Sequence, residues 1–236
     1  MVHPRVLRAI STPLLGHLDP VFLALMDDIQ ALLRFVFQTK NRFTIAVSGT
    51  GSAGMEASIV NIIEPGDAVI VGVNGVFGTR LATIVERCGG KSIRVEAPWG
   101  QIIDPDAVDH ALRRSGPVKA VAIVHAETST GAWQPLEPIA RLCRDQDTLF
   151  LVDAVTSLGG APVEIDRWGI DVCYSGTQNS RMYHARPWAK EQSTRGGKVP
   201  NWHNAPNLVH MVYLVCLVCL VCLVSLVCFV CLVERN

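Results

Sequence analysis

Short, almost uninterrupted apolar runs alternate with segments of helical periodicity, and this alternation restricts the fold of the chain more than any other feature. Residues 68–73, 118–124 and 149–152 are such runs, as expected for strands buried on both faces of a sheet. Residues 20–38 and 136–145 carry apolar side chains at helical spacing. Strand and helix repeated in this order predict an α/β fold, a mainly parallel sheet with helices on both faces.

Further segments extend the alternation. Residues 43–47 predict a strand that leads into a Gly-rich turn at 48–54, and a helix follows the turn. Residues 80–88 have helical spacing, and residues 91–95 predict a short strand. The segment 104–112 begins with Asp-Pro, the residue types of a helix N-cap and a first helical position.

Composition excludes some partners and indicates a compartment. Lys+Arg and Asp+Glu both number 21, so net charge gives no reason to expect nucleic acid or an anionic membrane surface as a partner. Five of the eight cysteines lie between residues 216 and 231, and the others are Cys88, Cys143 and Cys173. Scattered cysteines without metal-ligand spacing are typical of buried thiols in a reducing compartment. Residues 1–178, which begin without the apolar core of a secretory signal, are therefore expected to be intracellular.

The Gly-rich turn has the spacing of a dinucleotide-binding fingerprint, with Gly49, Gly51 and Gly54 at the three glycine positions. A nicotinamide-dependent oxidoreductase would also need a carboxylate at the end of the next strand. That strand ends at Val73-Asn74-Gly75, which has none. Because a helix N-terminus binds any phosphate, a different phosphate-bearing cofactor fits equally well, and a tight turn without a ligand is a third interpretation.

Two other strand ends carry polar groups. Asp153 closes the run 149–152, and a carboxylate at the carboxyl edge of a sheet can keep a pyridine nitrogen protonated or simply cap the next turn. Thr128 lies in the segment 125–131, whose hydroxyls could contact a cofactor ring or form a polar turn. Three suitable groups at the ends of strands in one sheet favour a cofactor site.

Several motifs together resemble one family. They are residues 48–57, 74–78, 125–131, 152–160 and 174–178. In this order they are similar to the class V, fold-type-I aminotransferases that use pyridoxal 5'-phosphate, and most of all to the alanine–glyoxylate and serine–glyoxylate (serine–pyruvate) group. The resemblance covers residues 4–178, a large domain that is incomplete at both ends.

The resemblance implies an activity and its partners. Such enzymes transfer an amino group from alanine or serine to glyoxylate, so the expected ligands are a small amino acid and a 2-oxo acid. A homodimer and a cytoplasmic or peroxisomal location are further implications.

The resemblance also assigns residues to the phosphate of the cofactor. Gly51, Ser52 and Ala53 take the positions that bind this phosphate, and Gln178 would help to hold it. Around the ring, Phe77 takes the position of the stacking aromatic side chain.

Three other residues are assigned to the cofactor ring. Thr128 takes the place of a contacting hydroxyl, Asp153 that of the carboxylate paired with the ring nitrogen, and Val155 that of an aliphatic contact. Without the resemblance, Val155 would be assigned to the core.

The position of the catalytic lysine is occupied by Asn179. An amide nitrogen is delocalised into its carbonyl and forms no Schiff base, whereas a lysine amine does. The Pro-Pro-Gly loop and the C-terminal domain of the family are also absent from the sequence, and Lys190 and Lys198 lie in a segment that does not match. We therefore expect no catalytic residue and no transaminase activity in this chain, and weak binding of the free cofactor aldehyde.

After the match the sequence changes character. Residues 179–212 are polar and aperiodic and are predicted to be irregular. Residues 213–233 are apolar and contain a Leu-Val-Cys repeat. They are long enough for a transmembrane helix, which would make the product a membrane-tethered pseudoenzyme. Alternatively, residues 179–236 arise from a shifted reading frame, a retained intron or a faulty gene model. The repeat, such as a repetitive nucleotide tract would encode, favours this second interpretation.

Overall fold

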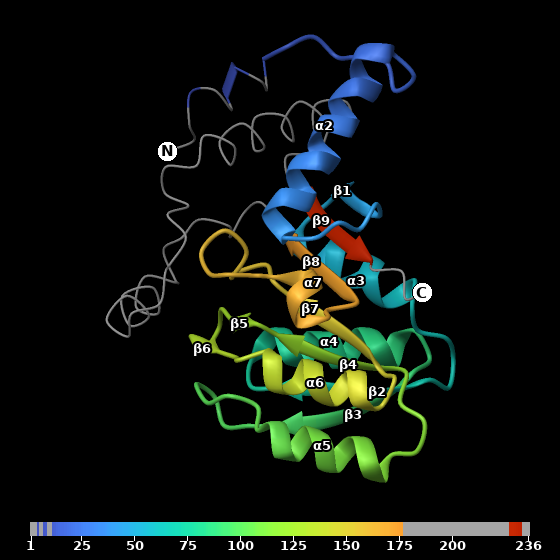
Figure 1. The fold of residues 1–236 in the computed structure, drawn as a ribbon, viewed down its shortest axis with the longest axis vertical. Helices are drawn as coiled ribbons and strands as arrows, with labels where there is room; N and C mark the ends of the chain where they lie inside the picture. The colour runs from blue at the N-terminus through green and yellow to red at the C-terminus, as the bar shows by residue number, and fades with distance from the viewer. Residues whose placement is uncertain (1–3, 5–6, 9–10, 177–226, 233–236) are drawn as a thin grey trace.

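A computed structural model of the chain describes residues 4, 7, 8, 11–176 and 227–232 (Figure 1). Two positions of the expected site, Gln178 and Asn179, lie outside the described residues, as do the whole segment 179–212 and most of the apolar tail.

A seven-stranded sheet forms the centre of the molecule, in the order β1-β9-β8-β7-β4-β2-β3. The strands are β1 (Thr44–Ser48), β2 (Ala68–Val73), β3 (Lys91–Glu96), β4 (Ala120–Val124), β7 (Leu149–Asp153), β8 (Val172–Gly176) and β9 (Val227–Leu232). Neighbours from β8 to β3 pair in parallel, whereas β9 is antiparallel to both β1 and β8. The predicted α/β fold with a mainly parallel sheet is confirmed.

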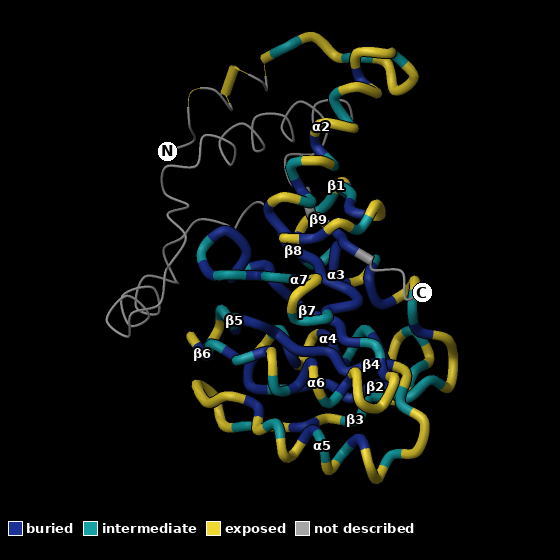
Figure 2. Tube along the Cα trace, viewed as in Figure 1, coloured by how far each residue is buried: buried dark blue, intermediate teal, exposed yellow. Residues whose placement is uncertain are grey.

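Helices cover both faces of the sheet (Figure 1). Those on one face are α2 (Pro20–Phe37), α5 (Pro105–Arg114), α6 (Glu137–Asp145) and α7 (Ile165–Trp168). Those on the other face are α3 (Gly51–Val60) and α4 (Val76–Arg87). Because successive strand residues point to opposite faces, β4 contributes Val121 and Ile123 to the first core and Ala120, Ala122 and Val124 to the second. Buried residues accordingly follow the central strands in Figure 2.

Local sequence explains where several elements begin. Asp104 caps α5, since its side chain accepts a hydrogen bond from the Asp106 N–H, and Pro105 occupies the first turn as predicted. Helix α4 begins at Val76 rather than near residue 80, because the Glu127 carboxylate accepts from the N–H groups of Phe77 and Gly78 in its first turn. The small hairpin β5 (Ala126–Glu127) and β6 (Ala132–Trp133) gave no periodic signal in the sequence.

The end of the apolar tail is a strand, and the expectation of a transmembrane helix over 213–233 is wrong for the residues that the structure describes. Strand β9 lies between β1 and β8, with Ile45 and Tyr174 both aligned with Val230. Its backbone groups pair on both sides with strand edges that would otherwise lack hydrogen-bond partners. No helix in the described ranges is long and apolar enough to cross a membrane.

Candidate cofactor site

The polar groups predicted from the sequence gather at one edge of the sheet. Strands β1, β2, β4, β7 and β8 run in the same direction, so their carboxyl ends meet at the same edge. Helix α3 follows β1, α4 follows β2, and Asp153 ends β7. The order of elements in the sheet therefore brings together segments that are far apart in the sequence, such as the start of α3 and the end of β7.

The N-terminus of α3 presents backbone donors at this edge. Thr50 is the N-cap, and its side chain makes no capping hydrogen bond. The Ala53 N–H donates to the Thr50 carbonyl over 2.8 Å, so this amide already has an acceptor. The N–H groups of Gly51 and Ser52 belong to the first turn and have no acceptor within the helix. This turn can bind an anion, and the Thr50 hydroxyl adds a donor that the sequence analysis missed.

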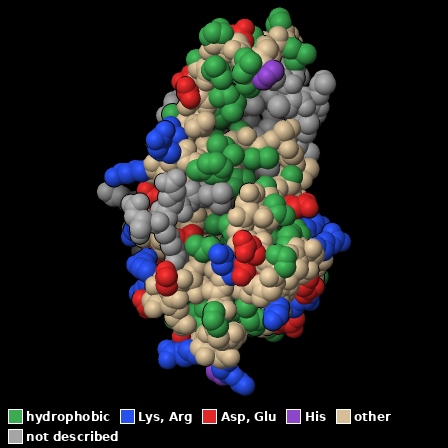
Figure 3. Space-filling model, turned by 90° about the vertical axis from the view of Figure 1, so that its right-hand side faces the viewer, with side chains coloured by type: hydrophobic (Ala, Val, Ile, Leu, Met, Phe, Trp, Pro, Cys, Tyr) green, Lys and Arg blue, Asp and Glu red, His purple; other side chains and the backbone are tan. Residues whose placement is uncertain are grey.

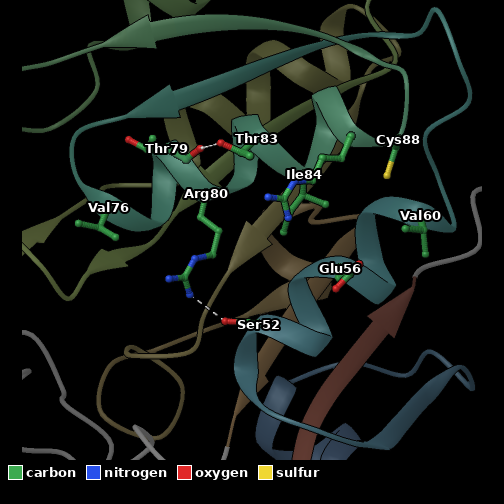
Figure 4. Close-up of a pocket in the computed structure, with 10 residues that line it drawn as sticks. Ser52, Glu56, Val60, Val76, Thr79, Arg80, Thr83, Ile84 and Cys88 are labelled. Atoms are coloured by element: carbon green, nitrogen blue, oxygen red, sulfur yellow. Dashed lines mark hydrogen bonds between the residues drawn. The ribbon is translucent and has the colours of Figure 1, made fainter.

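Arg80 extends from α4 toward α3 and adds a positive charge to this turn (Figure 4). Its Nη1 donates to Ser52 Oγ over 2.9 Å, and its guanidinium carbon lies 5.3 Å from the centre of the Phe77 ring. One side chain thus links the expected phosphate position with the expected stacking ring. The sequence did not indicate this role, because Arg80 is remote from the Gly-rich turn along the chain.

A groove between α3 and α4 adjoins these residues. It has a volume of about 650 Å³, and the close-up shows side chains of both helices along it (Figure 4). Its walls include Ser52 and Glu56 from α3 and Thr79, Arg80 and Thr83 from α4. The guanidinium lies at the end of the groove near Ser52, in the first turn of α3.

Glu127 fixes the start of α4. Its side chain is 1% exposed. One carboxylate oxygen accepts from the N–H groups of Phe77 and Gly78 over 3.1 and 3.2 Å. The other accepts from both the N–H and the hydroxyl of Ser129. A carboxylate at a helix N-terminus is stabilised by the helix dipole. Glu127 therefore positions Phe77 from a neighbouring strand end, a role that only tertiary structure reveals.

Asp153 is a buried carboxylate at the end of β7, 4% exposed. It accepts hydrogen bonds from the Val155 N–H over 2.9 Å and from the Tyr174 hydroxyl over 2.8 Å. Burial raises the pKa of the carboxyl from 3.8 to about 6, although both hydrogen bonds lower it. Asp153 has no ion-pair partner among the described residues. A mostly ionised, buried carboxylate without a cation is suited to a positively charged ligand group.

Val155 contacts this carboxylate through its N–H, and Thr128 contacts the segment that follows it. The Thr128 hydroxyl is hydrogen-bonded to the Thr156 hydroxyl, which joins the turn between β5 and β6 to the loop after β7. Val155 is 9% exposed and packs in the core beneath α3 and α4. Val155 donates directly to Asp153, and Thr128 is the neighbour of Ser129, which donates to Glu127.

His125, at the end of β4, is fully buried between two indole rings. Its ring centre lies 5.6 Å from that of Trp133 and 5.8 Å from that of Trp168. Neither ring nitrogen has a hydrogen-bond partner among the described residues. Burial lowers the pKa of His125 from 6.5 to about 3, so the imidazole is neutral at physiological pH.

The sequence profile of the family described as "Aminotransferase class-V" matches residues 15–183. The chain therefore belongs to the class-V aminotransferases, enzymes that depend on pyridoxal phosphate.

Two similar curated proteins both have glyoxylate in their names. The chain is 45% identical over 177 residues to the (S)-ureidoglycine–glyoxylate transaminase of Bacillus subtilis, which is 75% of this chain and 42% of the relative. It is 41% identical over 175 residues to the alanine–glyoxylate aminotransferase of Rattus norvegicus, which is 74% of this chain and 42% of the relative. The chain thus spans less than half the length of these curated relatives.

A solved structure of a similar aminotransferase has the same fold. The alanine–glyoxylate aminotransferase of Nostoc sp. superposes with a TM-score of 0.74 at 42% sequence identity, over 92% of this chain and 64% of that one. The fold expected from the resemblance, the large domain of a pyridoxal-phosphate transferase, is confirmed.

Proposed function

We propose that residues 1–178 are the cofactor-binding half of a glyoxylate aminotransferase, whose full-length form transfers an amino group from alanine or serine to glyoxylate. The observation that carries this proposal is the buried Asp153 carboxylate without a cation, at a strand end of a class-V aminotransferase fold. Glyoxylate appears in the names of both relatives and of the solved structure described above, which supports it as the amino acceptor.

The residues at the sheet edge suit pyridoxal phosphate chemically. The first-turn N–H groups of Gly51 and Ser52, with Ala53 beside them and the Arg80 guanidinium across, offer donors to a phosphate. Asp153 offers a buried negative charge to a ring nitrogen, and the Tyr174 and Val155 hydrogen bonds hold that charge in place. Phe77 and Val155 supply apolar contacts to a ring, and Thr128 a hydroxyl. Gln178 would add a phosphate contact from beyond the described residues.

The cofactor, when bound, supplies the electron sink through which an amino group moves between substrates. Asp153 would favour that role by keeping the ring nitrogen protonated. Transfer also requires an amine that carries the cofactor and shuttles the substrate proton. Asn179 offers an amide in its place, so we infer that this chain binds the cofactor without turnover.

We also propose that a complete enzyme of this type is a homodimer. Large apolar side chains on α2 and on the segment before it are exposed: Leu14, Leu18, Val21, Leu23 and Phe35. Figure 3 shows hydrophobic side chains toward the α2 end of the face in view. Sedimentation equilibrium of the chain, beside a variant with Leu18→Asp and Val21→Asp, tests whether this surface is covered by a second copy.

A chimera tests the proposed activity. Residues 1–178 of this chain are joined to the segment of the Bacillus subtilis relative that begins at its own lysine. We expect the chimera to transfer amino groups to glyoxylate, and a comparison of alanine, serine and ureidoglycine identifies the donor. The unmodified chain, assayed in parallel, should show no turnover. A chimera that binds the cofactor yet rejects glyoxylate contradicts the substrate, and turnover by the unmodified chain contradicts the role given to Asn179.

Ligand binding distinguishes the proposed aminotransferase from the alternative interpretation, a nicotinamide-dependent oxidoreductase. A ribose-binding carboxylate would be needed at the end of β2, where the structure has Asn74. This residue is 3% exposed, and its side-chain Nδ2 donates a hydrogen bond to the Gln101 carbonyl over 2.7 Å. We therefore expect titration calorimetry to detect pyridoxal phosphate but not NAD. The reverse result would favour the nicotinamide enzyme.

A further inference from the structure

Two cysteines lie side by side in the sheet, one inside the segment that matches the family and one in the apolar tail. Cys173 of β8 and Cys231 of β9 are directly aligned in the antiparallel pair. Both are 0% exposed and both belong to the core on the α2, α5 and α6 face, so their side chains point to the same side of the sheet.

Aligned residues of an antiparallel pair have Cα atoms about 4.5 to 5.5 Å apart. Disulfides span Cα separations of about 4.4 to 6.8 Å. The backbone is therefore already placed for a bond between the two sulfurs. Cys231 Sγ at present accepts hydrogen bonds from Thr44 Oγ1 over 3.5 Å and from Asn41 Nδ2 over 3.7 Å. A bond to Cys173 would compete with these two weak contacts of the Cys231 sulfur.

We propose that Cys173 and Cys231 form a disulfide that fastens the C-terminal strand into the centre of the sheet. The reaction is a thiol–disulfide exchange with a small disulfide such as oxidised glutathione. The Cys231 thiolate attacks one glutathione sulfur, which forms a mixed disulfide and releases one glutathione thiolate. The Cys173 thiolate then attacks the Cys231 sulfur and displaces the second. Two protein thiols lose two protons and two electrons, and one glutathione disulfide becomes two glutathione thiols.

The position of β9 explains how a buried pair is reached. Burial raises the pKa of both thiols, so neither reacts readily while the strand is in place. Single elements of a fold open locally at a lower free energy than the whole protein unfolds, and local opening of β9 would expose both thiols. The first exchange therefore occurs when β9 is displaced, and the second when it returns. We expect the reaction to be slower than alkylation of the half-buried Cys88.

The Leu-Val-Cys repeat makes the bond informative about register. A shift of β9 by three residues places Cys228 opposite Cys173 and Val227 opposite Tyr174, so the sequence opposite β8 is almost unchanged. Because the hydrophobic pattern sets strand register, a repeat that presents nearly the same pattern after the shift discriminates weakly between the two registers. A bond from Cys173 to Cys231 records the register of the structure, and a bond to Cys228 would record the shifted one.

The experiment is peptide mapping of the full chain after incubation with oxidised glutathione. Remaining thiols are alkylated, and the protein is digested without reduction. Chymotrypsin cleaves after Tyr174, Leu226, Phe229 and Leu232, and so separates Cys228 from Cys231. We expect residues 230–232 joined to the fragment that contains Cys173, and loss of this pair after dithiothreitol. Oxidation should also raise the melting temperature reversibly.

Variants distinguish the proposal from general oxidation. Cys228→Ser, in the same repeat, and Cys143→Ser, in the same core, should both retain the bond. Cys173→Ser should abolish every link between the tail and the core, together with the melting-temperature difference between its oxidised and reduced forms. Three results would overturn the proposal: Cys173 remaining fully alkylated, a bond from Cys173 to Cys228, or glutathione retained on Cys231 without the second exchange.

Discussion

The carboxyl edge of the sheet and strand β9 are organised in different ways. At the carboxyl edge of β2, β4 and β7, single polar residues fix the geometry: Glu127 holds the start of α4, and Asp153 is held by Val155 and Tyr174. Strand β9 has the opposite character, since a repeat of apolar residues occupies the space between β1 and β8. A cofactor site depends on residues that occur once, whereas a position inside a sheet requires only an apolar strand with free backbone groups.

Substitution of Glu127 should have the largest effect on the polar carboxyl edge of the sheet. Glu127→Ala leaves the buried N–H groups of Phe77 and Gly78 without their acceptor, and each such group costs about 1 to 3 kcal/mol. We expect a decrease of about 4 kcal/mol in the free energy of unfolding, measured in urea. Glu127→Gln keeps one acceptor oxygen and should cost less. Glu96→Ala, at an exposed position, should have little effect, and a similar loss there would mean that burial is not the cause.

Acid should destabilise the same region through His125. The pKa of His125 is about 3 in the folded protein and 6.5 as the ordinary value, so the unfolded chain binds a proton that the folded chain does not. The stability that the neutral imidazole contributes is complete above pH 6.5 and is lost as the pH falls toward 3. From pH 7.5 to 4.5 this amounts to about 3 kcal/mol.

Comparison of variants isolates this effect. His125→Phe should lose less stability than the natural sequence over that pH range, and His110→Gln, at an exposed position, should behave like the natural sequence. Asp153 acts in the other direction: its pKa is raised to about 6, so its contribution is complete below 3.8 and is lost as the pH rises through 6. Equal pH dependence in His125→Phe and the natural sequence would show that His125 is not the responsible group.

The comparison also explains what could be predicted from the sequence. Strands β2, β4 and β7 and helices α2, α5 and α6 carry strong local periodicity, and their positions were predicted to within a few residues. Asp153 and the turn at Gly51 could be predicted as site residues because each lies at the carboxyl end of a predicted strand, and the structure places both at strand ends of one sheet. These features depend on short-range pattern.

Other features depend on contacts between distant segments. Glu127 acts on α4 from another strand end, and Arg80 reaches Ser52 across two helices. Neither contact leaves a periodic signal. The transmembrane alternative for residues 213–233 is wrong, where the structure describes them, for a related reason. Apolarity and length suit either a membrane helix or a buried strand, and pairing with β1 and β8 decides between the two.

A matched pair of substitutions tests whether β9 is interchangeable along its repeat. Val172 and Val230 are both 3% exposed and lie on neighbouring strands in the same core. Val172→Ala should cost about 1.5 kcal/mol for the two carbons removed, because β8 has no repeat that offers a substitute. Val230→Ala should cost less than half as much, since a three-residue shift brings Val227 to the same place. Equal costs in urea unfolding would mean that the register of β9 is fixed by something other than apolarity.

The smallest expected effect concerns Arg80, which tests whether a single exposed side chain matters at the polar edge. Its guanidinium donates to Ser52 at the start of α3 and lies over Phe77, so it would add a charge-assisted hydrogen bond to a phosphate held there. An exposed pair of this kind contributes up to about 1 kcal/mol, which is roughly a fivefold change in Kd. Arg80→Met should weaken pyridoxal phosphate binding by this factor, and Arg80→Lys by less, as measured by calorimetry. Inorganic phosphate should compete with the cofactor in the natural sequence and compete less well in Arg80→Met. If Arg80→Met changed cofactor affinity without changing competition by phosphate, the guanidinium would act through the Phe77 ring rather than through the anion site at α3.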